Sequence, residues 1–222
     1  MGKIDIKGDI VSDDAGVFYE YFGMSSTYPK LVQDAIANDE DEEITLNIAS
    51  NGGDVFAASE IYTMLKASGK RIVVNVQGLA ASAASVISMA GDTVRISPTA
   101  HIMIHKASTG IVGNSDDLEH QSAVLNSIDE SIALAYEMKT DLKQPELLDL
   151  MAKETWLNAK TAVDKGFADE IMFFDNDEKE IMVTNATHQL PSKSAITKFK
   201  NMIATPKTNT LREQKLAILL EK

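Results

Sequence analysis

Residues 71–85 read RIVVNVQGLAASAAS and contain the clearest strand-to-helix transition in the chain. Arg71 to Val76 is rich in Val and Ile, which favours a buried strand. Gly78 ends this run, and the small residues that follow predict a helix from about Ala81 to Ala90. Because a strand followed by a helix is the repeating unit of proteins with a parallel sheet, this stretch predicts an α/β fold.

The same alternation of strand and helix extends to both sides of this stretch. An alternating pattern of apolar and polar residues predicts a strand, and apolar residues spaced three or four apart predict a helix. Strands are expected at 3–10, 44–48, 93–96 and 102–104, and helices at 28–38, 55–68, 115–140, 145–151 and 159–165. The β-α-β-α order indicates parallel strands joined by helical crossovers.

Composition excludes several classes of protein. The formal net charge of −12 makes the chain a poor candidate for binding nucleic acid or an anionic membrane. The absence of cysteine excludes disulfides, thiolate metal sites and cysteine nucleophiles. The N-terminus lacks the pattern of a signal peptide, and the longest apolar run, 79–90, is too short and too polar to span a bilayer. We therefore expect a cytoplasmic protein with no nucleic-acid or membrane partner.

The charge changes sign near the end of the chain. Residues 1–175 carry 13 basic and 28 acidic residues (−15), whereas residues 176–222 carry eight basic and five acidic residues (+3). We expect residues 1–174 to form the folded domain and residues 175–222 to form a basic, partly flexible extension with one terminal helix from Leu211 on. A disordered end and an arm that binds a partner both remain open for this extension.

Three junctions at strand ends carry candidate chemistry, since the active sites of open α/β sheets gather at the carboxyl ends of strands. Gly52 and Gly53 follow one strand and leave backbone N–H groups accessible to an oxyanion. Ser82 lies at the start of the small-residue helix, where a nucleophile is well placed and the N–H of Ala83 can support an oxyanion. His105 ends a short apolar strand and suits a general base.

Each feature also has a plain structural explanation. The glycine pair can be a tight turn, the serines at 82, 85 and 88 can allow close helix packing, and the histidines at 101, 120 and 188 can be structural. His101 and His105 share one side of a strand, but no third ligand lies at a useful spacing, so we expect no metal and no other cofactor. Together, however, the three junctions supply a nucleophile, a base and two oxyanion donors, which is the set of groups that acyl transfer needs.

Four blocks of the sequence resemble the Clp protease proteolytic subunit family, ClpP. They are SNGG at 50–53, GLAASA at 78–83, MIHK at 103–106 and WLNAKTAVDKGFAD at 156–169. The resemblance runs from about Ile4 to Ile171. Within that superfamily, the short N-terminus and the tail after Phe174 resemble the ClpP-like head maturation proteases of tailed phages and prophages.

The resemblance implies a spiral of ββα units, shared with the crotonases, and assembly into a homo-oligomer, as a heptameric ring or double ring. It implies Ser82 as nucleophile, His105 as base, and the N–H groups of Gly53 and Ala83 as oxyanion hole. It also implies that Gly52, Thr109, Gly110, Ile111 and Val112 bind an extended peptide, by addition of a strand. The helix over 115–140 matches the handle through which family members make ring-to-ring contacts.

Two positions depart from the family pattern. The third member of the triad is an Asp in the family, and alignment on Trp156 places Glu154 there; Asp149 is the fallback. A Glu can orient an imidazole as an Asp does. Only three residues precede Ile4, so the segment that docks an unfoldase ATPase is largely missing. We therefore doubt an ATPase partner and expect a capsid or scaffold protein as the polypeptide substrate.

The sequence thus predicts a serine endopeptidase that forms an acyl-enzyme on Ser82, most like a head maturation protease. Two alternatives remain within the family: a housekeeping ATP-dependent Clp proteolytic subunit, and an inactive ring-forming assembly scaffold. A crotonase-like acyl-CoA enzyme would share the paired N–H groups, but such enzymes rely on carboxylates and lack the pair formed by Ser82 and His105.

Overall fold

The computed structural model describes residues 2–173. The extension that we expect over 175–222, with its terminal helix, lies outside the described residues.

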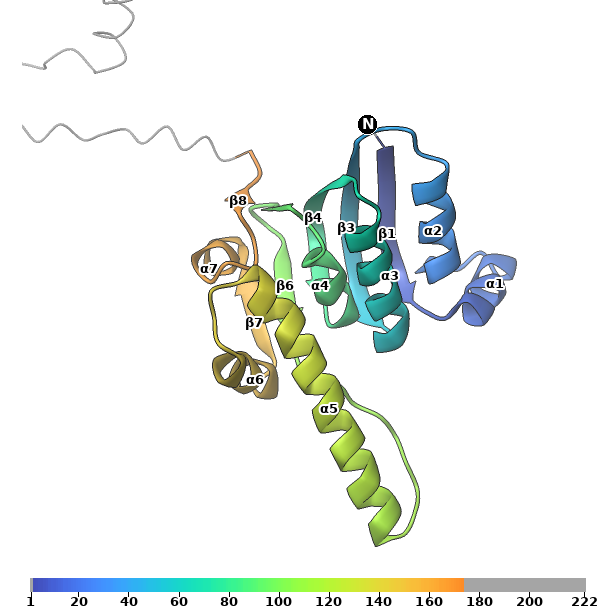
Figure 1. Ribbon diagram of the computed structural model, residues 1–222, viewed down its shortest axis with the longest axis vertical. Coiled ribbons are helices and arrows are strands. Elements are labelled where there is room, and N and C mark those ends of the chain that lie inside the picture. The colour runs from blue at the N-terminus through green and yellow to red at the C-terminus, as the bar shows by residue number, and fades with distance from the viewer. Residues whose placement is uncertain (1, 174–222) are drawn as a thin grey trace, which may run out of the picture. The chain divides into compact units, whose positions relative to one another are not determined.

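A parallel sheet forms the centre of the fold (Figure 1). Its strands follow the order β2-β1-β3-β4-β5-β8, and each neighbouring pair along this path is parallel. They are β1 (Gly2–Ile10), β2 (Ser26–Thr27), β3 (Glu43–Gly53), β4 (Arg71–Ala81), β5 (Thr93–Ile96) and β8 (Glu170–Ile171). Off this path, β6 (His101–Ile104) pairs parallel with the end of β4, and β7 (Thr155–Asn158) pairs antiparallel with β6. The predicted α/β fold with parallel strands is confirmed.

Seven helices connect the strands within the described residues. They are α1 (Asp13–Tyr21), α2 (Pro29–Ala37), α3 (Val55–Ala67), α4 (Ala83–Ser88), α5 (Ser115–Lys139), α6 (Gln144–Ala152) and α7 (Ala159–Asp164). Figure 1 shows α2, α3 and α4 beside the sheet, while α5 extends away from it. The apolar faces of the helices and central strands form one core, with fully buried side chains that include Ile6, Leu46, Ile48, Ile61, Leu65, Val74 and Ile87.

Two strands are longer than the sequence predicts, and this difference places the candidate site. β3 continues past Ile48 to Gly53, and β4 continues past Val76 to Ala81. The register shifts after Ile48, and pairing then resumes between Ser50 and Ala80. Parallel pairing therefore carries both strands through glycines that would end an isolated strand. The following helix, α4, is correspondingly shorter than the predicted helix over 81–90.

Several elements were not predicted from the sequence: α1, β2, β7 and β8. Ser12 caps α1, where its side chain accepts a hydrogen bond from the N–H of Ala15 and two acidic residues follow in the first turn. These signals are visible in the sequence. The apolar side chains of α1 are exposed, however, so its apolar pattern does not reveal a core-facing stripe.

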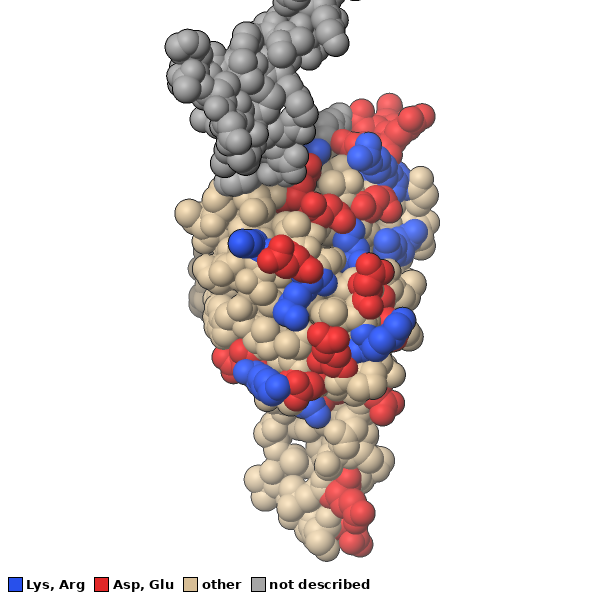
Figure 2. Space-filling model, turned by 90° about the vertical axis from the view of Figure 1, so that its left-hand side faces the viewer, with Lys and Arg blue, Asp and Glu red and all other residues tan. Residues whose placement is uncertain are grey.

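The surface carries mixed charge. On the face in Figure 2, Lys and Arg side chains lie among Asp and Glu side chains. Exposed ion pairs such as Lys30–Asp34 and Lys153–Asp149, both at 2.5 Å, contribute little to the free energy of unfolding. Among the helices of residues 2–173, none is both long and apolar enough to cross a membrane.

Candidate active site

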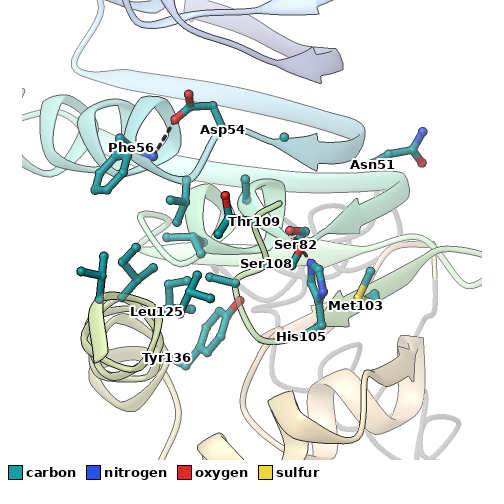
Figure 3. A pocket seen from close by; sticks show the side chains of 18 of the residues that line it. Asn51, Asp54, Phe56, Ser82, Met103, His105, Ser108, Thr109, Leu125 and Tyr136 are labelled. Atoms are coloured by element: carbon teal, nitrogen blue, oxygen red, sulfur yellow. Dashed lines mark hydrogen bonds between the residues drawn. The ribbon is translucent and has the colours of Figure 1, made fainter. Parts of the chain in front are cut away.

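The ends of β4 and β6 bring Ser82 and His105 together. Ala81 at the end of β4 pairs with Met103 in β6, and the N–H of Ser82 donates to the carbonyl of Met103 at 2.9 Å. Both candidate residues follow directly from these two strands. Nε2 of His105 lies 2.7 Å from Oγ of Ser82, within hydrogen-bond distance (Figure 3). The nucleophile and the base predicted from the sequence are therefore in contact.

The backbone of Ser82 adopts a conformation that side-chain-bearing residues rarely adopt. Its φ is 53° and its ψ is −123°, and it directly precedes α4. Such a conformation costs on the order of 1–3 kcal/mol and persists only where surrounding contacts enforce it. The carbonyl of Ser82 accepts from the N–H of Ser85 at 2.9 Å and from its Oγ at 2.6 Å. The sharp turn presents the side chain of Ser82 between the end of β4 and the start of α4.

Ser82 and His105 line a cavity of about 610 Å³. Gly53 and Ala83 line the same cavity, together with Asp54 and Phe56 at the start of α3. The opposite wall comes from α5 and is mostly apolar; it comprises Val124, Leu125, Ile128, Ile132 and Tyr136. The cavity thus combines a polar end at the serine with an apolar wall, a common combination in sites that bind organic ligands.

The glycine pair lets the end of β3 approach Ser82. Gly52 has φ 96°, and a Cβ there would lie 2.6 Å from the carbonyl oxygen of Ala81 and 2.8 Å from Cβ of Ser82. Gly53 has φ 148°, and a Cβ there would lie 2.1 Å from the carbonyl oxygen of Ile10. No side chain fits at either position. The N–H of Gly52 donates to Oγ of Ser50 at 3.0 Å, so it is not free to bind an oxyanion. Gly52 instead allows the end of β3 to lie close to Ser82.

The N–H of Ala83 has no acceptor within its own helix and can therefore donate to an oxyanion. Ala83 is the first residue of α4, and the first N–H groups of a helix have no acceptor within that helix. Gly53 and Ala83, whose N–H groups we expect to form the oxyanion hole, line the same cavity as Ser82.

Glu154, expected at the third triad position, is not bonded to His105. Ile104 pairs with Thr155 between the antiparallel strands β6 and β7; His105 directly follows the one residue and Glu154 directly precedes the other. Oε1 of Glu154 accepts a hydrogen bond from Nε1 of Trp156 at 3.2 Å, and its backbone φ is 48°. Within residues 2–173 no carboxylate bonds to the imidazole of His105. Asp149, the fallback, pairs with Lys153 instead.

The segment expected to bind a peptide is exposed. Thr109 lines the cavity, whereas Gly110, Ile111 and Val112 do not. Residues 105–114 form no strand in the described chain, and the peptide binding expected of residues 109–112 stays a prediction. A strand is defined by its pairing, and no other described strand lies alongside this segment to pair with it.

A buried acid on α5, which the sequence analysis missed, holds the chain just after His105. Asp129 is 2% exposed; its Oδ1 accepts the N–H of Ala107 at 2.8 Å and its Oδ2 lies 3.6 Å from Nζ of Lys106. A signal was available, because Asp129 interrupts the apolar stripe of α5 next to Ile128 and four residues after Leu125. An acid at such a position needs a buried partner.

Residues 2–173 contain no cluster of three side chains that could hold a metal ion.

Comparison with known proteins agrees with this geometry. The Clp protease family model matches residues 27–175. The ATP-dependent Clp protease proteolytic subunit of Deinococcus radiodurans is 31% identical over 134 residues, which cover 60% of this chain and 66% of that subunit, just under two thirds. Proteolytic subunit 1 of Chlamydia abortus is 31% identical over 140 residues, covering 61% of this chain and 73% of that subunit. The chain therefore belongs to the Clp protease family of ClpP-like serine proteases.

Proposed function

We propose that this protein is a serine endopeptidase that cleaves peptide bonds through an acyl-enzyme on Ser82. The observation that carries the proposal is the 2.7 Å contact between Oγ of Ser82 and Nε2 of His105 at the polar end of a cavity. A nucleophile within hydrogen-bond distance of its base is the arrangement that acyl transfer requires. Membership of the Clp protease family supports the same reaction class.

The first half of the reaction forms the acyl-enzyme. Nε2 of His105 accepts the proton of Ser82 as Oγ attacks the carbonyl carbon of the peptide bond. The N–H groups of Gly53 and Ala83 donate to the oxyanion of the tetrahedral intermediate. The imidazolium of His105 then gives its proton to the leaving amine, and the C–N bond breaks.

The second half releases the new carboxyl end of the substrate. His105 takes a proton from water, whose oxygen attacks the acyl carbon, and the proton returns to Oγ of Ser82 as the ester bond breaks. Glu154 stabilises the imidazolium in both halves after its carboxylate turns from Trp156 toward His105. The apolar wall of α5 favours substrates with an apolar side chain next to the cleaved bond.

Intact-mass spectrometry after treatment with a fluorophosphonate probe tests this proposal. We expect one adduct on the wild-type protein and none on Ser82→Ala. The matched control is Ser131→Ala, because the hydroxyl of Ser131 donates only to the carbonyl of Ser127 within α5; this variant should react at the wild-type rate. An adduct that persists in Ser82→Ala would assign the nucleophile elsewhere, and an unlabelled wild-type protein would contradict the peptidase reaction.

We further propose that the protein acts in the cytoplasm during maturation of a phage or prophage head, on capsid or scaffold protein. The resemblance of the sequence after Phe174 to the tails of ClpP-like head maturation proteases supports this context. The relatives named ATP-dependent Clp protease proteolytic subunits favour the alternative, in which an unfoldase delivers the substrate. Incubation of the purified protein with a phage capsid protein separates the two: cleavage without ATP supports head maturation, and cleavage only with an unfoldase and ATP supports the alternative.

Assembly into a homo-oligomer is part of the same proposal. Leu134 and Met138 lie one turn apart on α5 and are 53% and 73% exposed, and Phe56 on α3 is 70% exposed. Together they line an apolar cavity of about 440 Å³ between these two helices. Apolar side chains grouped in this way favour burial against another subunit. Sedimentation velocity should therefore show a ring-sized particle, whereas a monomer at micromolar concentration would contradict assembly.

A further inference from the structure

The hydroxyl of Tyr136 is buried directly beneath the candidate nucleophile. Tyr136 lies on α5, is 1% exposed, and packs its ring against Phe167 with 5.4 Å between ring centroids. Its hydroxyl oxygen lies 2.7 Å from Oγ of Ser85. Figure 3 shows the hydroxyl end of Tyr136 directed from α5 toward the interior of the site. The catalytic steps above make no use of this hydroxyl, so its contacts need another explanation.

The direction of the hydrogen bonds follows from the number of protons. Ser85 has one hydroxyl proton, and the carbonyl of Ser82 at 2.6 Å can only accept it. The contact between Ser85 and Tyr136 therefore uses the proton of Tyr136, which donates to Oγ of Ser85. Burial raises the pKa of the Tyr136 phenol above its usual value, so this hydroxyl is protonated at neutral pH. The result is a chain of two hydrogen bonds from Tyr136 through Ser85 to the carbonyl of Ser82.

This chain ends on the residue whose backbone is strained. The carbonyl of Ser82 also accepts from the N–H of Ser85, and its own N–H is held by Met103. With φ at 53°, Ser82 keeps its conformation only where surrounding contacts enforce it, and the hydrogen bonds to its carbonyl are among these contacts. A hydroxyl that already accepts a hydrogen bond is a stronger donor, so Tyr136 strengthens the bond from Ser85 to Ser82.

We propose that Tyr136 is a positioning residue, which acts through Ser85 to hold the backbone of Ser82 so that Oγ stays within reach of His105. The proposal rests on the proposed function, because it assigns Tyr136 a role in the reaction of Ser82. It also gives α5 a second role beside lining the cavity: the helix fixes the turn that presents the nucleophile.

Tyr136→Phe removes the hydroxyl and keeps the ring. We expect the maximal rate of fluorophosphonate labelling at Ser82 to fall about fivefold, which corresponds to one hydrogen bond. The probe concentration that gives half of this rate should change by less than about twofold, since the cavity wall keeps its shape. Urea unfolding followed by circular dichroism establishes that the variant is fully folded in the assay. Ser131→Ala, which removes a hydroxyl from the same helix, should label at the wild-type rate.

A double-mutant cycle separates positioning from general stabilisation. Ser85→Ala removes the link, so adding Tyr136→Phe to it should cause no further loss of labelling rate. The double variant should also unfold at a higher urea concentration than Ser85→Ala alone, because Tyr136 no longer leaves a buried hydroxyl without an acceptor.

Labelling of folded Tyr136→Phe at the wild-type rate would overturn the proposal, and so would a further fall in rate when Tyr136→Phe is added to Ser85→Ala. Neither result affects the proposed function, which fails only if the wild-type protein is not labelled or is labelled away from Ser82.

Discussion

Gly52 shows how one missing side chain positions the nucleophile. At φ 96°, a Cβ on Gly52 would lie 2.6 Å from the carbonyl oxygen of Ala81 and 2.8 Å from Cβ of Ser82. Gly52→Ala must therefore move the end of β3 away from Ser82 or distort the turn. A displacement of about 1 Å at a reacting group costs about 100-fold in rate, so we expect fluorophosphonate labelling to fall at least that far.

The matched control for Gly52→Ala is Gly78→Ala. Gly78 lies in β4, and a Cβ there meets no atom within 4 Å. This variant should label at the wild-type rate. Equal labelling by both glycine variants would show that close approach of β3 to Ser82 does not matter for the reaction.

Glu154 is expected to orient His105 but makes no hydrogen bond to it. The alignment on Trp156 predicts a triad acid at Glu154, which directly precedes the pair formed by Thr155 and Ile104, but the Glu154 carboxylate accepts a hydrogen bond from Nε1 of Trp156. We expect Glu154→Gln to lower the labelling rate by about 100-fold or more, because an amide cannot stabilise the imidazolium by charge.

Two further variants check the assignment of the acid. Trp156→Phe removes the competing donor and should label at least as fast as the wild-type protein. Asp149→Asn alters an exposed acid that is paired with Lys153 and should leave the rate unchanged. A loss of labelling in Asp149→Asn, with none in Glu154→Gln, would reverse the assignment.

Helix α5 has a structural role in addition to the ring contacts that the family resemblance implies. Asp129 on this helix accepts the N–H of Ala107 and faces Lys106, so it holds the segment that follows His105. Asp129→Ala should lower the free energy of unfolding by about 2 kcal/mol, since it leaves a buried N–H without its charged acceptor. Urea unfolding measured by circular dichroism gives this value.

Glu130→Ala is the neighbouring control for Asp129→Ala. Glu130 is exposed on the same helix, so its loss should change the free energy of unfolding by less than about 0.5 kcal/mol. Asp129→Asn keeps an oxygen that can accept from Ala107 and should recover part of the loss. An Asp129→Ala variant as stable as the wild-type protein would remove the structural role that we assign to this contact.

Local patterns predicted those elements whose apolar faces are buried in the core. The alternation over 3–10 and the helical spacing over 55–68 and 115–140 correspond closely to β1, α3 and α5. The patterns did not predict how far β3 and β4 extend, because their last residues are held by pairing such as Ser50 with Ala80, which joins segments 30 residues apart. The exposed apolar face of α1 gave no core signal either.

The candidate residues of the site could be predicted from the sequence, whereas their contact depends on the fold. Ser82 and His105 are 23 residues apart in the sequence, and their contact depends on β4 and β6 ending at the same edge of the sheet. That edge could be anticipated from the general rule for α/β sheets. The contacts of Asp129 and Tyr136 could not, because they depend on the direction in which α5 crosses the cavity and on one side-chain rotamer each.

A short segment, residues 167–171, completes the core and the sheet of the described fold. Phe167 is fully buried and packs on Tyr136, and the carboxylate of Asp169 accepts the N–H of Val94 and pairs with Lys139. β8 then adds to β5 at the edge of the sheet. We therefore expect residues 2–173 to be sufficient for the core and the cavity described here.

Two truncations test this boundary. A chain that ends at Phe173 should fold and label with the fluorophosphonate probe within about twofold of the full chain, because it keeps the complete core and cavity. A chain that ends at Lys165 loses Phe167, Asp169 and β8, and deletion of a buried Phe alone costs about 3–5 kcal/mol, a large fraction of the stability of a domain. We therefore expect the shorter chain to be unfolded by circular dichroism and unlabelled. If the chain ending at Phe173 were also unfolded, residues beyond it would belong to the folded domain, and the boundary inferred from the change in charge near residue 175 would be wrong.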